Sequence, residues 1–345
     1  MAETLAPTDM NISKPCADVS EAHNGQNNHA STVMSTMWYL ERSPLYDTEK
    51  PYSMRYNPDD GVPQSNFQKI RCPVKVKSMR EPGAGPFRLD ECGFQLIQLH
   101  SSLEPDDFWD QERVQSVYIQ EVKEALKKEL GAKYVHVLDY ALRKRHESFP
   151  ISTGEEYEYD QPTALAHIDF TRDEGERITK VLFGDRAGEV LKGRWQAVNI
   201  WKPIRGPLND WPLGLCDGRT LDFEKDTVSS DVVFDDFVTE NLQIYPNPAS
   251  EWYYLPDHNT WEALIFKSGD SDPSAAVPGC CHSGFFNPKS DKSELRQSLD
   301  CRCFVYYADL DEYPPIVADV TQPASADSLI VSGVPSMCIV AERVT

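Results

Sequence analysis

Short runs of apolar residues alternate with turns rich in Pro, Gly and Asp along most of the chain. This pattern predicts a body built mainly from β-strands. One amphipathic helix is expected between about Pro105 and Leu130, because apolar residues recur there at three- and four-residue spacing and Gly131 follows. Strands and helices do not alternate, so an antiparallel sandwich or barrel is favoured over a doubly wound fold. The clearest strands are expected at 134–142, 164–171, 194–201, 251–255, 262–267 and 296–307.

Both ends of the chain lack this periodicity. Residues 1–35 are polar and rich in Asn, Ser and Thr, which is typical of a flexible leader. Beyond Asp309 the chain is rich in Pro, Ala and Ser. No internal repeat or linker divides the remainder, so residues 36–345 are predicted to form one domain.

Charge and cysteine content narrow the possible partners. The chain has 55 acidic and 34 basic residues, for a formal net charge of -21, which argues against nucleic acid or an anionic membrane surface as partner. It contains no apolar run of membrane-spanning length and no secretory signal at its start. Nine scattered cysteines then indicate reduced thiols and a cytoplasmic location, whereas the oligomeric state is left open.

The first candidate for chemistry is the pair His167 and Asp169. They lie two residues apart in an expected strand, so their side chains share a face and present an imidazole beside a carboxylate. This H-x-D pattern is common, and a polar pair on a solvated strand face is the alternative reading. A metal site requires a third ligand, and His282, at the start of a late strand, is the best candidate.

Arg296 and Ser298 follow His282 on a strand whose alternation places Arg296, Ser298, Asp300 and Arg302 on one polar face. A guanidinium with a hydroxyl two residues away can hold a carboxylate. Two imidazoles and one carboxylate form the facial triad of non-haem Fe(II) oxygenases. The predicted site therefore binds Fe(II) through His167, Asp169 and His282, with O2 and 2-oxoglutarate as co-substrates. Arg296 with Ser298 is favoured as the anchor of the 2-oxoglutarate carboxylate, and Arg302 is the alternative.

Three other interpretations fit parts of this residue pattern. Cys280, Cys281 and His282 with Cys301 and Cys303 match no standard zinc spacing and are interpreted as buried thiols. A metal-dependent hydrolase could use the same three ligands but would not need the arginine–serine pair. A non-catalytic jelly-roll binding module would keep the fold without turnover.

The segments that carry these residues resemble the fungal hydroxylase/desaturase family of aspergillic-acid type, which is similar to a cephem 7α-methoxylase component and a gibberellin desaturase. The resemblance spans about residues 39–310 and rests on HIDFT at 167–171, VNIWKP at 198–203, PLGLCD at 212–217, EWYY at 251–254, FKSGD at 266–270, HSGF at 282–285 and RQSLDCR at 296–302. It implies a double-stranded β-helix, the jelly roll of cupin-like proteins, with flanking helices. It also implies a dioxygenase that hydroxylates, desaturates or cyclises a small molecule in secondary metabolism.

The chain departs from the family pattern at two positions. Lys202 and Gln297 stand where the family usually has Arg and Glu. Asn199 and Trp201 share a strand face, and the resemblance suggests that they line the site.

Overall fold

The computed structural model describes residues 32–58, 61–151, 157–291 and 294–310. The N-terminal part of the expected leader and the expected C-terminal tail lie outside these ranges. The first strand already begins at Thr32, inside the segment expected to be leader.

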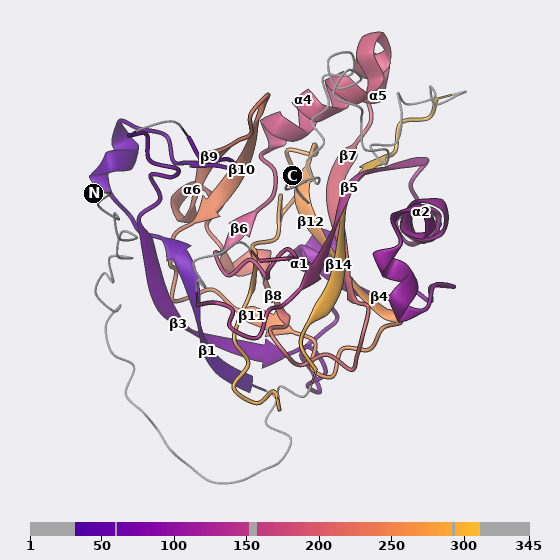
Figure 1. Ribbon diagram of the computed structural model, residues 1–345. Helices are drawn as coiled ribbons and strands as arrows, with labels where there is room; N and C mark the ends of the chain where they lie inside the picture. Colours follow the sequence, from indigo (N-terminus) through magenta and orange to yellow (C-terminus); the bar gives the residue numbers. More distant parts are fainter. Residues whose placement is uncertain (1–31, 59–60, 152–156, 292–293, 311–345) are drawn as a thin grey trace, which may run out of the picture.

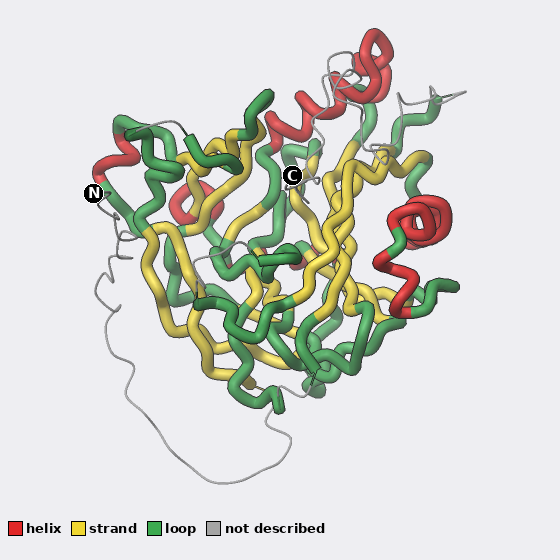
Figure 2. The backbone as a smooth tube through the Cα atoms, in the orientation of Figure 1, coloured by secondary structure: helices red, strands yellow, loops and turns green. Residues whose placement is uncertain are grey.

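Two curved sheets form the body of the molecule, as the strands in Figure 2 show. The larger sheet has nine strands in the order β1 (Thr32–Leu40), β3 (Lys69–Ser78), β11 (Trp252–Tyr254), β8 (Leu213–Cys216), β13 (His282–Gly284), β6 (His167–Ile168), β10 (Val238–Ile244), β9 (Thr227–Val233) and β2 (Tyr52–Met54). The smaller has five in the order β4 (Phe94–Gln98), β12 (Glu262–Asp270), β7 (Trp195–Pro203), β14 (Gln297–Tyr306) and β5 (Tyr134–Lys144). Most neighbours are antiparallel, so the predicted mainly-β architecture is confirmed.

Helices lie at the periphery of the sheets (Figures 1 and 2). They are η1 (Pro44–Asp47), α1 (Leu89–Cys92), η2 (Pro105–Trp109), α2 (Gln111–Arg113), η3 (Val114–Tyr118), α3 (Ile119–Leu130), α4 (Arg172–Phe183), η4 (Gly184–Arg186), α5 (Ala187–Val190), η5 (Gly218–Thr220) and α6 (Phe223–Asp226).

The predicted helix at 105–130 is present as four consecutive segments, η2, α2, η3 and α3. Asp110 caps α2 by accepting hydrogen bonds from the amides of Glu112 and Arg113. Gly131 ends α3 with φ of 66°, a conformation that glycine adopts without a Cβ clash. Val122 and Leu126 on its apolar face are buried in one core cluster with side chains of β5, β7 and β14. The helix therefore covers the outer face of the five-stranded sheet.

Alternation along β7 and β14 divides their side chains between that covered face and the opposite, inner face. Ile200 and Leu299 belong to the core beneath the helix. Asn199 and Ser298 point the other way. Asn199 donates to the ligand candidate Asp169, and Ser298 accepts from Arg296. The predicted polar face of the late strand is thus confirmed.

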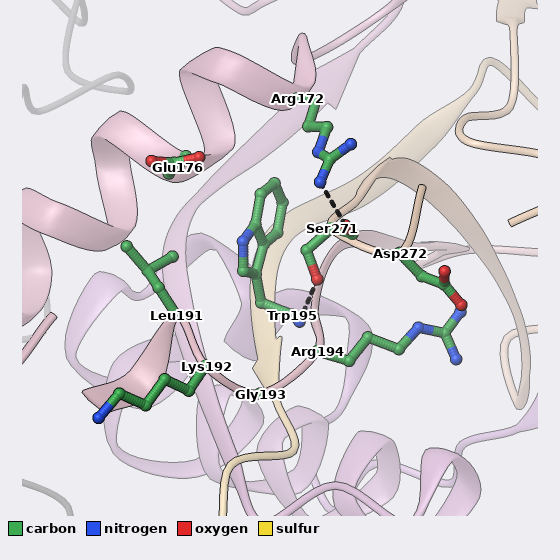
Figure 3. A pocket seen from close by; sticks show the side chains of 9 residues that line it. All are labelled: Arg172, Glu176, Leu191, Lys192, Gly193, Arg194, Trp195, Ser271 and Asp272. Carbon is green, nitrogen blue, oxygen red and sulfur yellow. Dashed lines mark hydrogen bonds between the residues drawn. The ribbon is translucent and has the colours of Figure 1, made fainter. Parts of the chain in front are cut away.

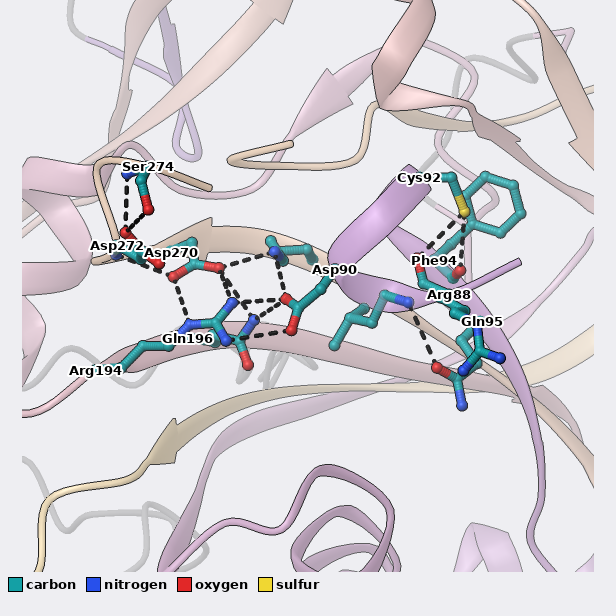
Figure 4. Close-up of polar contacts among 12 residues, drawn as sticks. Arg88, Asp90, Cys92, Phe94, Gln95, Arg194, Gln196, Asp270, Asp272 and Ser274 are labelled. Atoms are coloured by element: carbon teal, nitrogen blue, oxygen red, sulfur yellow. Dashed lines mark hydrogen bonds and ion pairs between the residues drawn. The ribbon is translucent and has the colours of Figure 1, made fainter. Parts of the chain in front are cut away.

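A partly buried ionic network joins α1 to the five-stranded sheet, and Figure 4 shows its members Asp90, Arg194 and Asp270. Lys267, which is fully buried, donates to Asp90 of α1 at 2.9 Å and to Asp270 at 2.8 Å. Arg194 binds the same two carboxylates. Burial alone would raise the pKa of Asp90, but the hydrogen bonds from Arg194 and Lys267 outweigh it and hold that pKa below its usual value. This network joins α1 to β7 and β12.

Candidate metal centre

Strand register brings His167 and His282 together. Residue 282 of β13 lies directly opposite residue 167 of β6 in the antiparallel pairing. Directly opposed residues of neighbouring strands project to the same side of a sheet, and the two imidazole rings lie 4.4 Å apart, centre to centre. Asp169 follows just after β6, which is much shorter than the strand predicted at 164–171.

The three predicted ligands converge. Oδ1 of Asp169 lies 3.2 Å from Nε2 of His167 and 3.9 Å from Nε2 of His282. One donor atom from each residue lies within 4.8 Å of the other two. Among the described residues, no other group of histidine, cysteine or acidic side chains converges in this way.

Backbone carbonyls fix the orientation of both imidazoles. Nδ1 of His167 lies 2.8 Å from the carbonyl oxygen of Leu165, and Nδ1 of His282 lies 3.2 Å from that of Cys280. Each Nδ1 therefore carries the proton and donates it, which leaves the Nε2 lone pairs directed toward the shared centre. Two neutral imidazoles and one carboxylate fit a divalent transition metal such as Fe(II).

The charges at the centre also suit a cation. Burial and the neighbouring His167 lower the pKa of His282 to about 4, so its imidazole is neutral at physiological pH. Burial opposes ionisation of Asp169, but its contacts with His167 and His282 hold its pKa well below the usual value. Asp169 is therefore a carboxylate anion beside the two imidazoles.

Arg296 was predicted to pair with Ser298, and the structure places them together. Nε of Arg296 donates to Oγ of Ser298 at 3.0 Å, and Nη1 donates to the carbonyl of Trp211 at 2.8 Å. The guanidinium also lies over the Trp201 ring, with 5.0 Å between Cζ and the ring centre. No carboxylate in the described ranges forms an ion pair with it, and burial lowers its pKa to about 9. This is a buried cation held by neutral groups.

Arg302 has a different environment. Its Nε donates to Oδ1 of Asp139 at 2.7 Å and its Nη2 donates to Oδ2, which is a bidentate ion pair between β14 and β5. The guanidinium that was predicted as the alternative anchor is therefore already bound to a carboxylate.

Residues 143–146 look like a solvated basic turn in the sequence, and that interpretation is wrong. Arg143 lies within β5, opposite Ser298, on the face that carries the candidate site. Arg145 is buried and donates to Asp210 at 2.6 Å, and Asp210 also accepts from the backbone amide of Arg296. The signal available in the sequence was that 143 continues the alternation of the strand from 139 and 141.

The described cysteines form no zinc site. Cys280, Cys281, Cys301 and Cys303 are buried thiols without a disulfide, as predicted. Burial raises the pKa of Cys281 well above its usual value, so the sulfur is a protonated, poor metal ligand.

The surface pocket in Figure 3 is separate from the candidate metal centre. Its volume is about 430 Å³, and its lining includes Arg172, Leu191, Trp195 and Ser271 but none of the three ligand candidates. Arg172 donates to the carbonyl of Ser271 across it.

In the described part of the chain, no helix has the length and apolar character that a bilayer span requires.

Curated fungal proteins are similar to most of this chain. The α-ketoglutarate-dependent dioxygenase tstK of Talaromyces stipitatus is 29% identical over 268 residues, covering 73% of this chain and 94% of tstK. The Fe(II)/2-oxoglutarate-dependent dioxygenase nvfI of Aspergillus novofumigatus is 28% identical over 76% of this chain and 93% of its own. The hydroxylase/desaturase efuI of Hormonema carpetanum is 27% identical over 69% and 84%.

A solved structure supports the same relationship. The iron and α-ketoglutarate-dependent endoperoxidase NvfI matches with a TM-score of 0.70 and 25% identity, over 81% of this chain and 100% of that one. The predicted jelly roll with flanking helices and the resemblance to hydroxylase/desaturases are thereby confirmed. The predicted enzyme class, with Fe(II), 2-oxoglutarate and O2, is confirmed as well.

The family described as "Oxidoreductase/YMDC permease-like domain" matches residues 37–306, a span that includes His167, Asp169, His282, Arg296 and Arg302. This span is most of the chain, and the chain therefore belongs to that oxidoreductase family.

Proposed function

We propose that this chain is an Fe(II)/2-oxoglutarate-dependent dioxygenase in which His167, Asp169 and His282 hold the iron and Arg296 with Ser298 anchors 2-oxoglutarate. The observation that carries the proposal is the convergence of the three donor atoms within 4.8 Å, with both Nδ1 atoms engaged by backbone carbonyls. Iron bound there supplies the redox centre at which 2-oxoglutarate and O2 are converted to succinate and CO2 while a substrate C–H bond is oxidised.

The residues around the ligands keep them in place. Asn199 donates to Oδ2 of Asp169, so that Oδ1 remains near the two imidazoles. The Phe266 ring packs 4.6 Å from the His282 ring, centre to centre, and limits its rotation. Such surroundings orient metal ligands before the metal binds.

Arg296 supports the co-substrate assignment because, among the described residues, it has no ion-pair partner. A buried guanidinium with only neutral acceptors favours an added carboxylate, which would form charge-assisted hydrogen bonds to it. Arg302 instead forms an ion pair with Asp139. We therefore assign the anchor to Arg296 and a structural role to Arg302.

The substrate is a small molecule of secondary metabolism, as the similarity to fungal hydroxylase/desaturases and dioxygenases suggests. Its position relative to the iron decides between hydroxylation, desaturation and ring closure. The curated relatives include hydroxylase/desaturases, and a structural relative is an endoperoxidase.

We further propose that the enzyme works in the cytoplasm and binds neither nucleic acid nor membranes. The net charge of -21 supports this proposal, because such a surface repels polyanions.

Absorption spectroscopy tests the assignment. Under anaerobic conditions, Fe(II) and 2-oxoglutarate added to the metal-free protein should give the weak visible charge-transfer absorption of a keto acid bound to ferrous iron. His167→Ala should abolish it, whereas His100→Ala, which changes an exposed histidine, should leave it intact. Absorption that persists in His167→Ala, or that is missing from the wild-type protein, would refute the metal site.

A further inference from the structure

Asp300 is a carboxyl group on the inner face of β14 that the proposed chemistry does not use. It lies between Ser298 and Arg302 on that face, opposite Ala141 of β5 and Trp201 of β7. The next inner-face residue of β14, Arg302, lies opposite Asn199, which donates to Asp169, so Asp300 lies near the proposed metal site.

This carboxyl group makes no hydrogen bond or ion pair within the described ranges, and its Oδ1 is out of reach of solvent. The other charged side chains of this inner face form hydrogen bonds or ion pairs. Arg302 pairs with Asp139, and Asp169 accepts from Asn199. A buried acceptor without a donor destabilises the fold by about 1–3 kcal/mol. A ligand that donates a hydrogen bond to Asp300 would remove this cost, which points to such a ligand.

Arg143 lies beside Asp300 on the same face. Register places it opposite Ser298, and its Nη1 donates to the carbonyl of Gln161 at 2.9 Å. Its charge opposes the effect of burial on the pKa of Asp300, which is raised to about 6. Asp300 is therefore mostly ionised at neutral pH and can only accept hydrogen bonds.

The charges of this face balance. It carries three cations and three anions, namely Arg143, Arg296, Arg302, Asp139, Asp169 and Asp300. Fe(II) and the 2-oxoglutarate dianion add no net charge. A charged substrate would leave one charge uncompensated in a partly desolvated site, whereas a neutral one would not.

We propose that Asp300 is a substrate-recognition residue whose Oδ1 accepts a hydrogen bond from a hydroxyl group of a neutral substrate held near the metal. This inference rests on the proposed dioxygenase function and adds the chemical class of its substrate. A site that requires such a hydroxyl group discriminates strongly against the analogue without it, since the carboxylate is then left unpaired.

The first test is thermal unfolding of the metal-free, full-length protein. Asp300→Leu removes the unpartnered carboxylate and should raise the melting temperature, as expected where a recognition group is kept at the expense of stability. Asp139→Leu is the matched control and should lower it, because the buried ion pair with Arg302 is lost. A melting temperature that falls in Asp300→Leu would show that the residue is structural and overturn the proposal.

The second test uses cyclohexanol, methoxycyclohexane and cyclohexylammonium as probes. Protein loaded with Mn(II) and 2-oxoglutarate broadens the NMR lines of any probe bound near the metal. Wild-type protein should bind the alcohol about tenfold more tightly than the ether, and more tightly than the ammonium. Asp300→Leu should lose this preference while retaining its affinities for Mn(II) and 2-oxoglutarate.

These measurements separate a failure of the role of Asp300 from a failure of the proposed dioxygenase function. Equal broadening by alcohol and ether, no broadening, preference for the ammonium, or an undiminished alcohol preference in Asp300→Leu would overturn the role of Asp300. Failure of the wild-type protein to bind Mn(II) or 2-oxoglutarate would instead overturn the proposed function.

Discussion

Asn199 donates a hydrogen bond of 2.5 Å to Oδ2 of Asp169. The amide is itself fixed, because Ser268 donates to its Oδ1 at 2.9 Å, which directs the NH2 group toward the carboxylate. Asn199 belongs to β7 and Ser268 to β12, so the five-stranded sheet orients a ligand candidate that follows a strand of the other sheet.

Asn199→Ala should weaken metal binding while the fold is retained. Partners of metal ligands typically contribute about 10–100-fold to affinity, so the Mn(II) dissociation constant should rise by that factor. Ser268→Ala should have a smaller effect in the same direction, since it only frees the amide to rotate. Titration of the metal-free protein with Mn(II), followed by electron paramagnetic resonance, measures both.

Asn287→Ala is the matched control for this prediction. Asn287 is also buried and donates to a backbone carbonyl, that of Asn209. Its loss should affect stability and leave Mn(II) affinity unchanged. Equal losses of affinity in the Asn199 and Asn287 variants would mean that the effect is general and not due to the orientation of Asp169.

Arg296 and Arg302 should respond differently to substitution by leucine. Arg296→Leu should raise the 2-oxoglutarate dissociation constant at least about tenfold, because a charge-assisted hydrogen bond contributes about 1.5–3 kcal/mol. Its melting temperature should change little, since the substitution also removes a buried charge that has no ion-pair partner among the described residues. Calorimetric titration of the Mn(II)-loaded protein with 2-oxoglutarate gives the constant.

Arg302→Leu leaves Asp139 buried without its partner and should lower the free energy of unfolding by about 2–4 kcal/mol. Burial already raises the pKa of Asp139. Affinity for 2-oxoglutarate should be nearly normal in the folded fraction. If Arg302→Leu lost 2-oxoglutarate and Arg296→Leu kept it, the two roles would have to be exchanged.

The sequence identified the three ligand candidates that the structure brings together, but it did not identify the residues around them. The spacing of His167 and Asp169 and the late position of His282 follow from residue types and alternation along a strand. The pairing of β6 with β13 does not, because register between segments more than a hundred residues apart is set by the whole sheet. The same limit applies to Arg302. Alternation along its strand predicts which face the side chain lies on, but not that Asp139 of β5 lies opposite and pairs with it.

The local sequence pattern also gave a wrong prediction for residues 143–146. A run of basic residues usually marks a solvated turn, yet Arg143 completes a strand and Arg145 is buried by its ion pair with Asp210. The helix at 105–130 was recognised from its apolar spacing, whereas its π-helical segment η3 was not, since nothing in residue spacing distinguishes that local change of hydrogen bonding.

Lys202 should make stability depend on pH. It is 2% exposed, and its ammonium lies over the rings of Phe108 and Tyr118 without an ion-pair partner in the described ranges. Burial lowers its pKa from 10.5 to about 8. Between these values the unfolded chain binds a proton that the folded chain does not, so stability should rise with pH through this window. Below pH 8 the buried charge of Lys202 lowers the free energy of unfolding by about 3 kcal/mol.

Lys202→Met should therefore be more stable than the wild-type protein at pH 7, by about 1–3 kcal/mol once the lost cation–π contacts are subtracted. Its advantage should shrink as the pH rises from 8 to 10. Urea unfolding of both proteins across this range measures the difference, and effects of other titrating groups cancel in it. A difference that does not vary with pH would contradict the titration of Lys202.

Gly175 of α4 is predicted to be required for packing of that helix on the sheet. A Cβ atom at this position would lie 2.2 Å from Cη2 of Trp195, a ring that is 2% exposed at the start of β7. Trp195 cannot retreat, because its ring packs 6.0 Å from that of Phe304, centre to centre, within the core. Gly175→Ala should thus lower the free energy of unfolding by about 1–3 kcal/mol, the usual cost of overpacking.

Gly188→Ala in α5 provides the comparison for Gly175→Ala, measured by the same urea titration. A Cβ at Gly188 meets no atom within 4 Å, so the better helix propensity of alanine should leave stability unchanged or raise it by up to about 1 kcal/mol. The two variants make the same chemical change, and only the contact with Trp195 distinguishes them. Equal responses would show that α4 can shift away from β7, and that its position, just after the Asp169 segment, is not fixed by this contact.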